Sequence, residues 1–262
     1  MLRPMRFAVI GDIHADFTLA DAMIRRHAGS VDAVFSVGDA EPNRDEAESL
    51  GVAGPAKYRK VGDFPRFAAG LQTMSAPLYF IGGNHEPWPA LDEHGPGEWA
   101  PGFHFLGRSG VAEIAGLRVA FLSGIYSRHF SEPAEPPAIT PARLKEYGYF
   151  TRPHVDRLLH QARGRRIDLL ITHDWPAGLA YRHHGKTAVG CDRIRMLTDA
   201  LNPQVHVCGH MHVPYRERIG ATDVVCLSQV RHGTAPADTV AVLELGADGV
   251  LKELVPAGPA SG

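Results

Sequence analysis

Five short polar blocks, each placed directly after an apolar run, constrain this chain more than any other feature of its sequence. Each block offers nitrogen or oxygen donors where a buried strand would end. The blocks are Gly11-Asp12-Ile13-His14, Gly38-Asp39, Gly83-Asn84-His85-Glu86, Thr172-His173-Asp174 and Gly209-His210-Met211-His212. Because ligands bind outside the carboxyl ends of strands in open α/β sheets, we expect these distant blocks to converge.

Apolar runs of strand length alternate with helical patterns along most of the chain. Unbroken apolar runs are typical of strands that are covered on both faces. We expect strands at Phe7–Ile10, Ala33–Val37, Leu78–Ile81, Val119–Ser123, Ile167–Thr172 and Val205–Cys208. Helices are expected around the apolar stripes Leu19, Met23 and Ile24; Val155, Leu158 and Leu159; and Ile194, Leu197 and Leu201. This alternation predicts an α/β fold of two stacked sheets flanked by helices.

The last part of the chain has a different pattern, in which apolar segments follow one another with short turn signals between them. It predicts an antiparallel meander of four strands at Val213–Ile219, Val224–Leu227, Thr239–Leu245 and Val250–Val255. Since there is no internal repeat and no sharp change of composition, we expect one domain over residues 1–255 and a frayed tail at 256–262. Pro133–Pro141 is expected to form a loop.

Composition narrows the classes of protein to which the chain can belong. The formal net charge of -2 provides no global field that would attract nucleic acid or a membrane. The absence of long apolar runs and of a signal-peptide pattern predicts a cytoplasmic protein without membrane contact. Three cysteines without Cys-x-x-Cys spacing fit a reducing compartment, and Cys208 is interpreted as a buried strand residue rather than a metal ligand.

The donors in the five blocks are sufficient for two adjacent metal ions. Residues two apart share a face of an extended segment, so the Asp-x-His and His-x-His pairs can each turn two donors to one side. We assign Asp12, His14 and His212 to the first ion and Asn84, His173 and His210 to the second, with Asp39 as the bridge. Mixed imidazole and carboxylate ligands favour Mn, Fe or Zn.

Two such ions indicate metal-assisted hydrolysis of a phosphate ester. They lower the pKa of a shared water, and the resulting bridging hydroxide is expected to attack phosphorus. We expect His85, which neighbours a ligand but points elsewhere, to donate a proton to the leaving group. Asp174 is expected to orient the ring of His173.

The five blocks together resemble the signature of calcineurin-like metallophosphoesterases and span almost the full chain. The resemblance implies a four-layer α/β/β/α sandwich with a dinuclear metal centre. A narrower resemblance, to RNA lariat debranching enzymes, implies cleavage of a 2′,5′-phosphodiester, although those enzymes often have Cys where this chain has Asp12. It is carried by Arg44–Ala47, Pro55–Arg59, Ile81–Glu86, Ser123–Tyr126 with His129 after it, and His173–Pro176.

Two segments outside the metal set are expected to contact substrate. Lys57, Arg59 and Lys60 with Tyr58 form a basic and aromatic cluster suited to phosphate and base contacts, although a solvated loop is the alternative. Tyr126, Arg128 and His129 follow a strand and are expected to approach the metal ions.

These observations favour a phosphodiesterase that acts on a nucleotide or on nucleic acid such as RNA. The same metal centre would serve a phosphomonoesterase that acts on proteins or nucleotides. A non-catalytic scaffold of the same fold is the third hypothesis.

Overall fold

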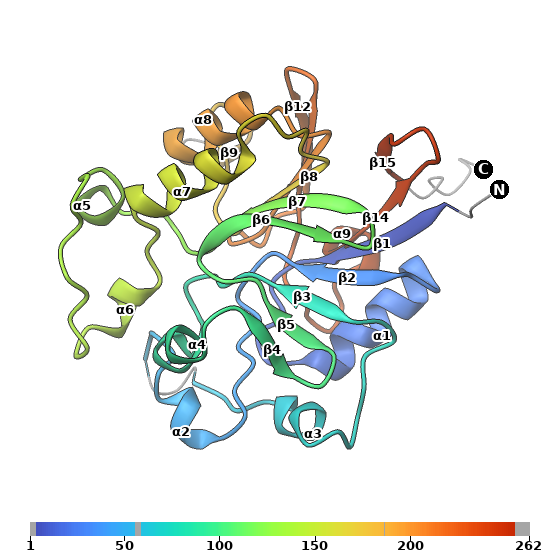
Figure 1. Ribbon diagram of the computed structural model, residues 1–262. Helices are drawn as coiled ribbons and strands as arrows, with labels where there is room; N and C mark the ends of the chain where they lie inside the picture. Colours follow the sequence, from blue (N-terminus) through green and yellow to red (C-terminus); the bar gives the residue numbers. More distant parts are fainter. Residues whose placement is uncertain (1–3, 56–58, 186, 255–262) are drawn as a thin grey trace.

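Two stacked sheets lie between layers of helices in the computed structural model, which describes residues 4–55, 59–185 and 187–254 (Figure 1). The expected four-layer α/β/β/α sandwich is confirmed. The tail expected at residues 256–262 lies outside the described residues. A single domain over residues 1–255 stays a prediction.

The first sheet has seven strands, and its central strand β1 (Met5–Ile10) is apolar on both faces. Ala8 and Ile10 pack with the outer helices, whereas Phe7 and Val9 pack against the second sheet. The strands β1, β2, β3 and β5 are parallel, so their carboxyl ends share one edge. The order is β15 (Leu251–Glu253), β14 (Val240–Leu245), β1, β2 (Ala33–Ser36), β3 (Leu78–Phe80), β5 (Phe103–Phe105) and β4 (Gly97–Ala100).

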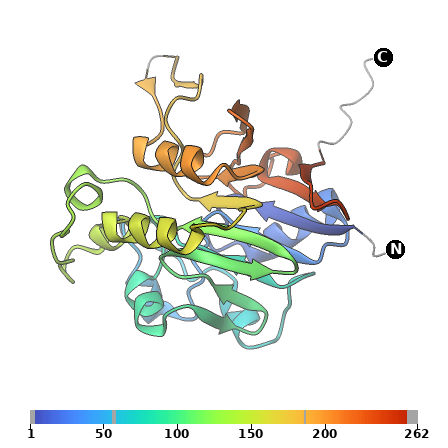
Figure 2. The same cartoon turned by 45° about the horizontal axis from the view of Figure 1, so that its top comes forward.

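The second sheet has six strands, four of which are parallel neighbours. Its order is β12 (Tyr215–Ile219), β13 (Thr222–Cys226), β11 (Val205–Cys208), β8 (Leu169–Thr172), β7 (Leu117–Leu122) and β6 (Ser109–Ile114). A two-stranded hairpin, β9 (Arg182–His183) with β10 (Thr187–Ala188), stands out from the body in Figure 2.

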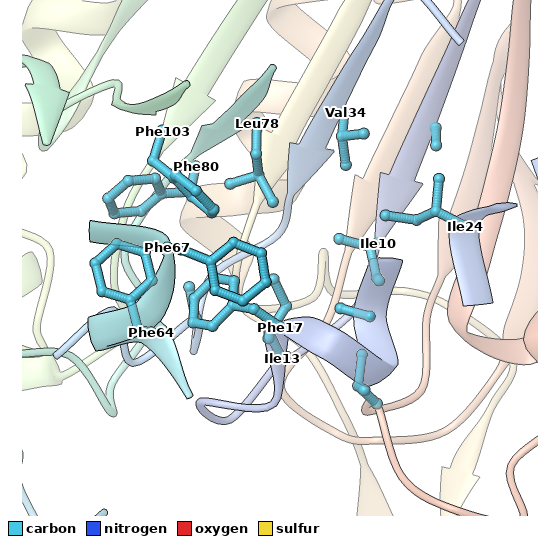
Figure 3. Packing of buried hydrophobic residues seen from close by; sticks show 14 of the residues in the cluster. Ile10, Ile13, Phe17, Ile24, Val34, Phe64, Phe67, Leu78, Phe80 and Phe103 are labelled. Carbon is cyan, nitrogen blue, oxygen red and sulfur yellow. The ribbon is translucent and has the colours of Figure 1, made fainter. Parts of the chain in front are cut away.

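Helices cover the outer face of each sheet. The first sheet is covered by α1 (Phe17–Ala28), α3 (Phe64–Ala68), α4 (Trp88–His94) and α9 (Pro236–Thr239), and the second by α7 (Arg152–Ala162) and α8 (Asp192–Leu201). The rings of Phe17 and Phe103 meet edge to face with centroids 5.6 Å apart, which anchors α1 on the sheet (Figure 3). Three short helices lie in loops, namely α2 (Glu46–Ser49), α5 (Arg128–Ser131) and α6 (Leu144–Tyr147).

Local signals explain where the long helices begin and end. The side chain of Asp16 accepts a hydrogen bond from the backbone N–H of Leu19 at the start of α1, and Gly29 ends the helix with a φ of 66°. Asn202 ends α8 in the left-handed region, with a φ of 44°. Within the described ranges, no helix combines the length and hydropathy needed to cross a bilayer.

The predicted antiparallel meander is wrong. The four strands form two hairpins in different sheets, because β12 and β13 belong to the second sheet while β14 and β15 belong to the first. Each hairpin joins its sheet by pairing with a distant strand, β13 with β11 in parallel and β14 with β1 antiparallel. Turn signals between strands report local hairpins and carry no information on such distant pairing.

Candidate metal centre

Side chains from the ends of β1, β2, β8 and β11 form two groups of metal-ligand type at the carboxyl edges of the sheets. In each group the ligand atoms lie within 4.8 Å of one another. The first group is Asp12, His14 and His212, and the second is Asp39, His173 and His210. The structure thus brings together residues that lie up to 200 positions apart, as the strand-end argument predicts.

In the first group, atoms that carry lone pairs face one another. His14 Nδ1 lies 2.7 Å from Oε1 of Glu41, and a carboxylate can only accept, so Nδ1 is the donor. The lone pair of His14 Nε2 therefore points toward His212 Nε2 at 3.2 Å, and that atom lies 2.9 Å from Oδ2 of Asp12. Such a set of acceptors is stable only when a proton or a cation lies among them.

In the second group, which like the first draws on both sheets, the lone pairs also face one another. His173 Nδ1 donates to the carbonyl of Val37 at 2.9 Å, which leaves the lone pair on Nε2. That lone pair faces Oδ1 of Asn84 at 3.3 Å and Oδ2 of Asp39 at 3.4 Å. Both groups combine imidazole nitrogens with carboxylate oxygens, and Asn84 adds an amide oxygen to the second group. Such ligands fit divalent transition-metal ions.

Glycines bring the backbone close enough to fix the two carboxylates. A Cβ on Gly83 would lie 2.2 Å from Oδ1 of Asp39, and a Cβ on Gly209 would lie 2.2 Å from Oδ1 of Asp12. The backbone N–H of His85 donates to Asp39 Oδ1 at 2.7 Å, and that of His210 donates to both oxygens of Asp12 at 3.2 Å. Asp39 is therefore held by the block that follows β3, and Asp12 by the block that follows β11.

The backbone at the ligands is strained. His14, Asp39, His210 and His212 have φ values of 49°, 48°, 65° and 54°, in the left-handed region that side chains other than glycine disfavour. Such residues cost about 1–3 kcal/mol each and persist where surrounding contacts over-determine them, most often at functional sites. One such contact is the carbonyl of Asp39, which accepts the backbone N–H groups of Ile13 and His14 at 3.0 and 2.9 Å.

Two buried glutamates support the centre. Glu86 accepts the backbone N–H groups of Ala40, Glu41 and Gly83 at 2.9, 2.9 and 3.1 Å, which joins the loops after β2 and β3. Burial, followed by the charge of Asp39, raises the pKa of Glu86 to about 8. The loop in turn places Glu41, which is only 4% exposed, against His14. Sequence reasoning missed both roles, because acidic residues beside ligand blocks are usually solvated.

Carboxylates raise the pKa values of His14 and His173, whereas burial and the charge of His173 lower the pKa of His210. Burial lowers the pKa of His14, but the hydrogen bond to Glu41 and the charges of Asp39 and Asp12 outweigh it and raise the pKa to about 9. Burial likewise opposes the charged form of His173, yet Asp39 and Asp12 raise its pKa to about 10. A proton therefore takes the place of a cation in the metal-free protein.

The role predicted for Asp174 is wrong. The ring of His173 is oriented by the carbonyl of Val37. The carboxylate of Asp174 instead accepts the backbone N–H groups of Trp175 at 2.8 Å and Tyr126 at 3.2 Å, so it shapes the loops. Cys208 is buried in β11, as expected for a strand residue.

A cavity of about 720 Å³ opens beside the first group of ligands. His14, His85 and His212 line it, so the predicted proton donor lies where a substrate would bind. His85 Nδ1 lies 3.2 Å from the carbonyl of Ala53, which fixes the direction of the ring.

The predictions made for the substrate residues differ in outcome. Lys57 and Tyr58 lie outside the described residues. Arg59 lines a neighbouring cavity of about 530 Å³ rather than the cavity beside the first group of ligands. The hydroxyl of Tyr126 donates to Glu132 at 3.0 Å, and Arg128 and His129 are exposed on α5; none of these three lines either cavity.

Comparisons with known proteins agree with this geometry. A model of the calcineurin-like phosphoesterase family matches residues 5–214. The lariat debranching enzyme of Homo sapiens is 30% identical over 234 residues, which cover 80% of this chain and 42% of that enzyme. The enzyme of the same name from Schizosaccharomyces pombe is 29% identical over 230 residues, which cover 80% of this chain and 49% of that enzyme. The chain therefore spans about half the length of these relatives or less.

The likeness extends to solved structures. The crystal structure of a dimetal phosphatase from Danio rerio matches with a TM-score of 0.56 over 96% of each chain. At 15% sequence identity this match shows a shared fold alone.

Proposed function

The chain belongs to the calcineurin-like phosphoesterase family, and we propose that it hydrolyses phosphodiesters of nucleotides or nucleic acid with two divalent metal ions. One observation carries the proposal. Two groups of His and Asp side chains turn their lone pairs toward one another at the strand ends, and each group is able to hold one ion. The likeness to lariat debranching enzymes supports a diester, and a 2′,5′ linkage, as the substrate class.

The proposed ligands are the residues of the two groups with Asn84, and Asp39 is the proposed bridge. Mn, Fe and Zn are the ions proposed for this donor set. Bound divalent ions supply Lewis acidity, which lowers the pKa of water and neutralises charge on phosphoryl oxygens.

The protein's own groups would orient the metal ligands and protonate the leaving oxygen. Glu41 and the carbonyl of Val37 hold His14 and His173 in the tautomer that points Nε2 at the ligand groups. His85 lines the cavity without belonging to either group, and it is the proposed proton donor to the leaving oxygen.

The test is a comparison of substrates with metal-free protein to which Mn, Fe or Zn is added. The proposal predicts turnover of a small chromogenic phosphodiester and of a 2′,5′-linked dinucleotide, each faster than the matching monoester. Strong preference for monoesters would instead indicate a phosphomonoesterase. A metal-loaded protein that cleaves none of these substrates would indicate a scaffold.

A further inference from the structure

The cavity beside the first group of ligands is also lined by two cationic side chains, Lys60 and Arg231. Its lining includes Lys60 and the loop residues Gln229, Val230, Arg231 and His232, which lie between β13 and α9. We propose that Lys60 and Arg231 form a subsite for a phosphate group next to the scissile phosphodiester of an oligonucleotide. This inference rests on the proposed function and specifies its substrate.

The two cations are available to a ligand. Arg231 is exposed, and its guanidinium has no hydrogen bond or ion pair among the described residues. Lys60 Nζ has one partner in the same part of the structure, the carbonyl of His14 at 3.4 Å. A phosphate group can bind cationic side chains that have no carboxylate partner without breaking an existing ion pair.

Among the described residues, the two acidic residues that line this cavity form no ion pair with Lys60 or Arg231. Asp16 caps α1 through the backbone N–H of Leu19 at 3.1 Å. Glu41 accepts from His14 and is 4% exposed. Both carboxylates therefore leave Lys60 and Arg231 available to an anionic group of the substrate.

A smaller cavity lies beside the first. A second cavity of about 220 Å³ shares His232 with the first and runs along α1 past Arg26. A small diester fills the region of the metal ligands alone, whereas an oligonucleotide needs such a path for its next phosphate. The geometry thus favours an extended chain over an isolated nucleotide.

Two dinucleotide diesters that differ by a single terminal phosphate provide the test. The wild-type protein is expected to show a lower KM for the phosphorylated dinucleotide. Arg231→Gln and Lys60→Gln are each expected to raise that KM about tenfold or more, the usual effect of losing a charge-assisted hydrogen bond. The kcat, and the kinetics of a small chromogenic diester, should not change. The matched control is Arg157→Gln on the exposed face of α7.

A binding measurement separates this inference from the proposed function. The anisotropy of a fluorescent phosphorothioate oligonucleotide measures binding affinity without turnover. Arg231→Gln is expected to lower this affinity and to make it depend less steeply on salt concentration. Equal affinity and equal KM in wild type and both variants would overturn the subsite while leaving the phosphodiesterase activity intact. Absence of diester turnover, with the affinity difference present, would instead overturn the proposed function.

Discussion

His14 Nδ1 lies 2.7 Å from the carboxylate of Glu41, a residue held in the left-handed region with a φ of 51°. The carboxylate selects the tautomer of His14 and so turns Nε2 toward Asp12 and His212. A strained backbone at Glu41 is consistent with selection for this contact rather than for stability.

Replacing Glu41 is therefore expected to weaken one metal site. Glu41→Leu should lower the affinity of that site by about 10–100-fold, and Glu41→Gln, which keeps an acceptor, should restore part of it. Equilibrium dialysis with Mn measures both sites, and Glu46→Gln on the exposed surface of α2 is the control. Unchanged affinity in Glu41→Leu would show that His14 needs no orienting partner.

His85 should affect turnover rather than metal content. Its ring lines the cavity, whereas its contact with Asp39 is made by the backbone N–H, which alanine retains. His85→Ala is expected to bind both ions and to slow turnover by roughly 10²–10⁴-fold, the usual contribution of general acid catalysis. Metal analysis and kinetics on the same sample measure this, and loss of an ion in the variant would refute the assigned role.

Metal binding should release protons. The raised pKa values of His14, about 9, and His173, about 10, mean that both rings are protonated near neutral pH in the metal-free protein. A metal must displace these protons, so metal affinity should fall as the pH is lowered below these values. Calorimetry at pH 7.5 in buffers of different ionisation enthalpy measures the release, and two bound ions with no proton release would contradict the predicted ligands.

His206 should make the fold sensitive to acid. Burial lowers its pKa to about 3, so between pH 6.5 and 3 the unfolded chain binds a proton that the folded chain does not. The contribution of His206 to the free energy of unfolding is complete above pH 6.5. As the pH falls, the free energy of unfolding decreases, by about 2 kcal/mol at pH 5. Urea unfolding at pH 7.5 and pH 5 is expected to show a smaller pH effect in His206→Gln than in wild type. The exposed His160→Gln serves as control, and equal pH effects in all three proteins would rule out this account.

Much of the metal centre was predictable because its ligands follow buried strands. A strand such as Val205–Cys208 is buried throughout, so the polar residues that follow it lie at the carboxyl edge of the sheet. Convergence of the blocks follows from parallel pairing. The same pattern predicted α1, α7 and α8, whose apolar stripes recur at helical spacing.

The parts that were missed depend on distant contacts. Nothing local indicates that Glu86 accepts three backbone N–H groups, or that the carbonyl of Val37 orients His173 in place of Asp174. The pairing of β14 with β1 joins residues 230 or more positions apart, so the pattern of turns alone predicted the wrong sheet for it. Short helices such as α5 contain too few residues for a periodic signal.

The central claim is that these two groups of side chains hold two neighbouring divalent ions. Anomalous scattering from crystals of the protein loaded with Mn or Zn tests it most directly. The account predicts two peaks, one among Asp12, His14 and His212 and the other among Asp39, His173 and His210, with Asp39 in contact with both. A single peak, or peaks away from these side chains, would contradict it.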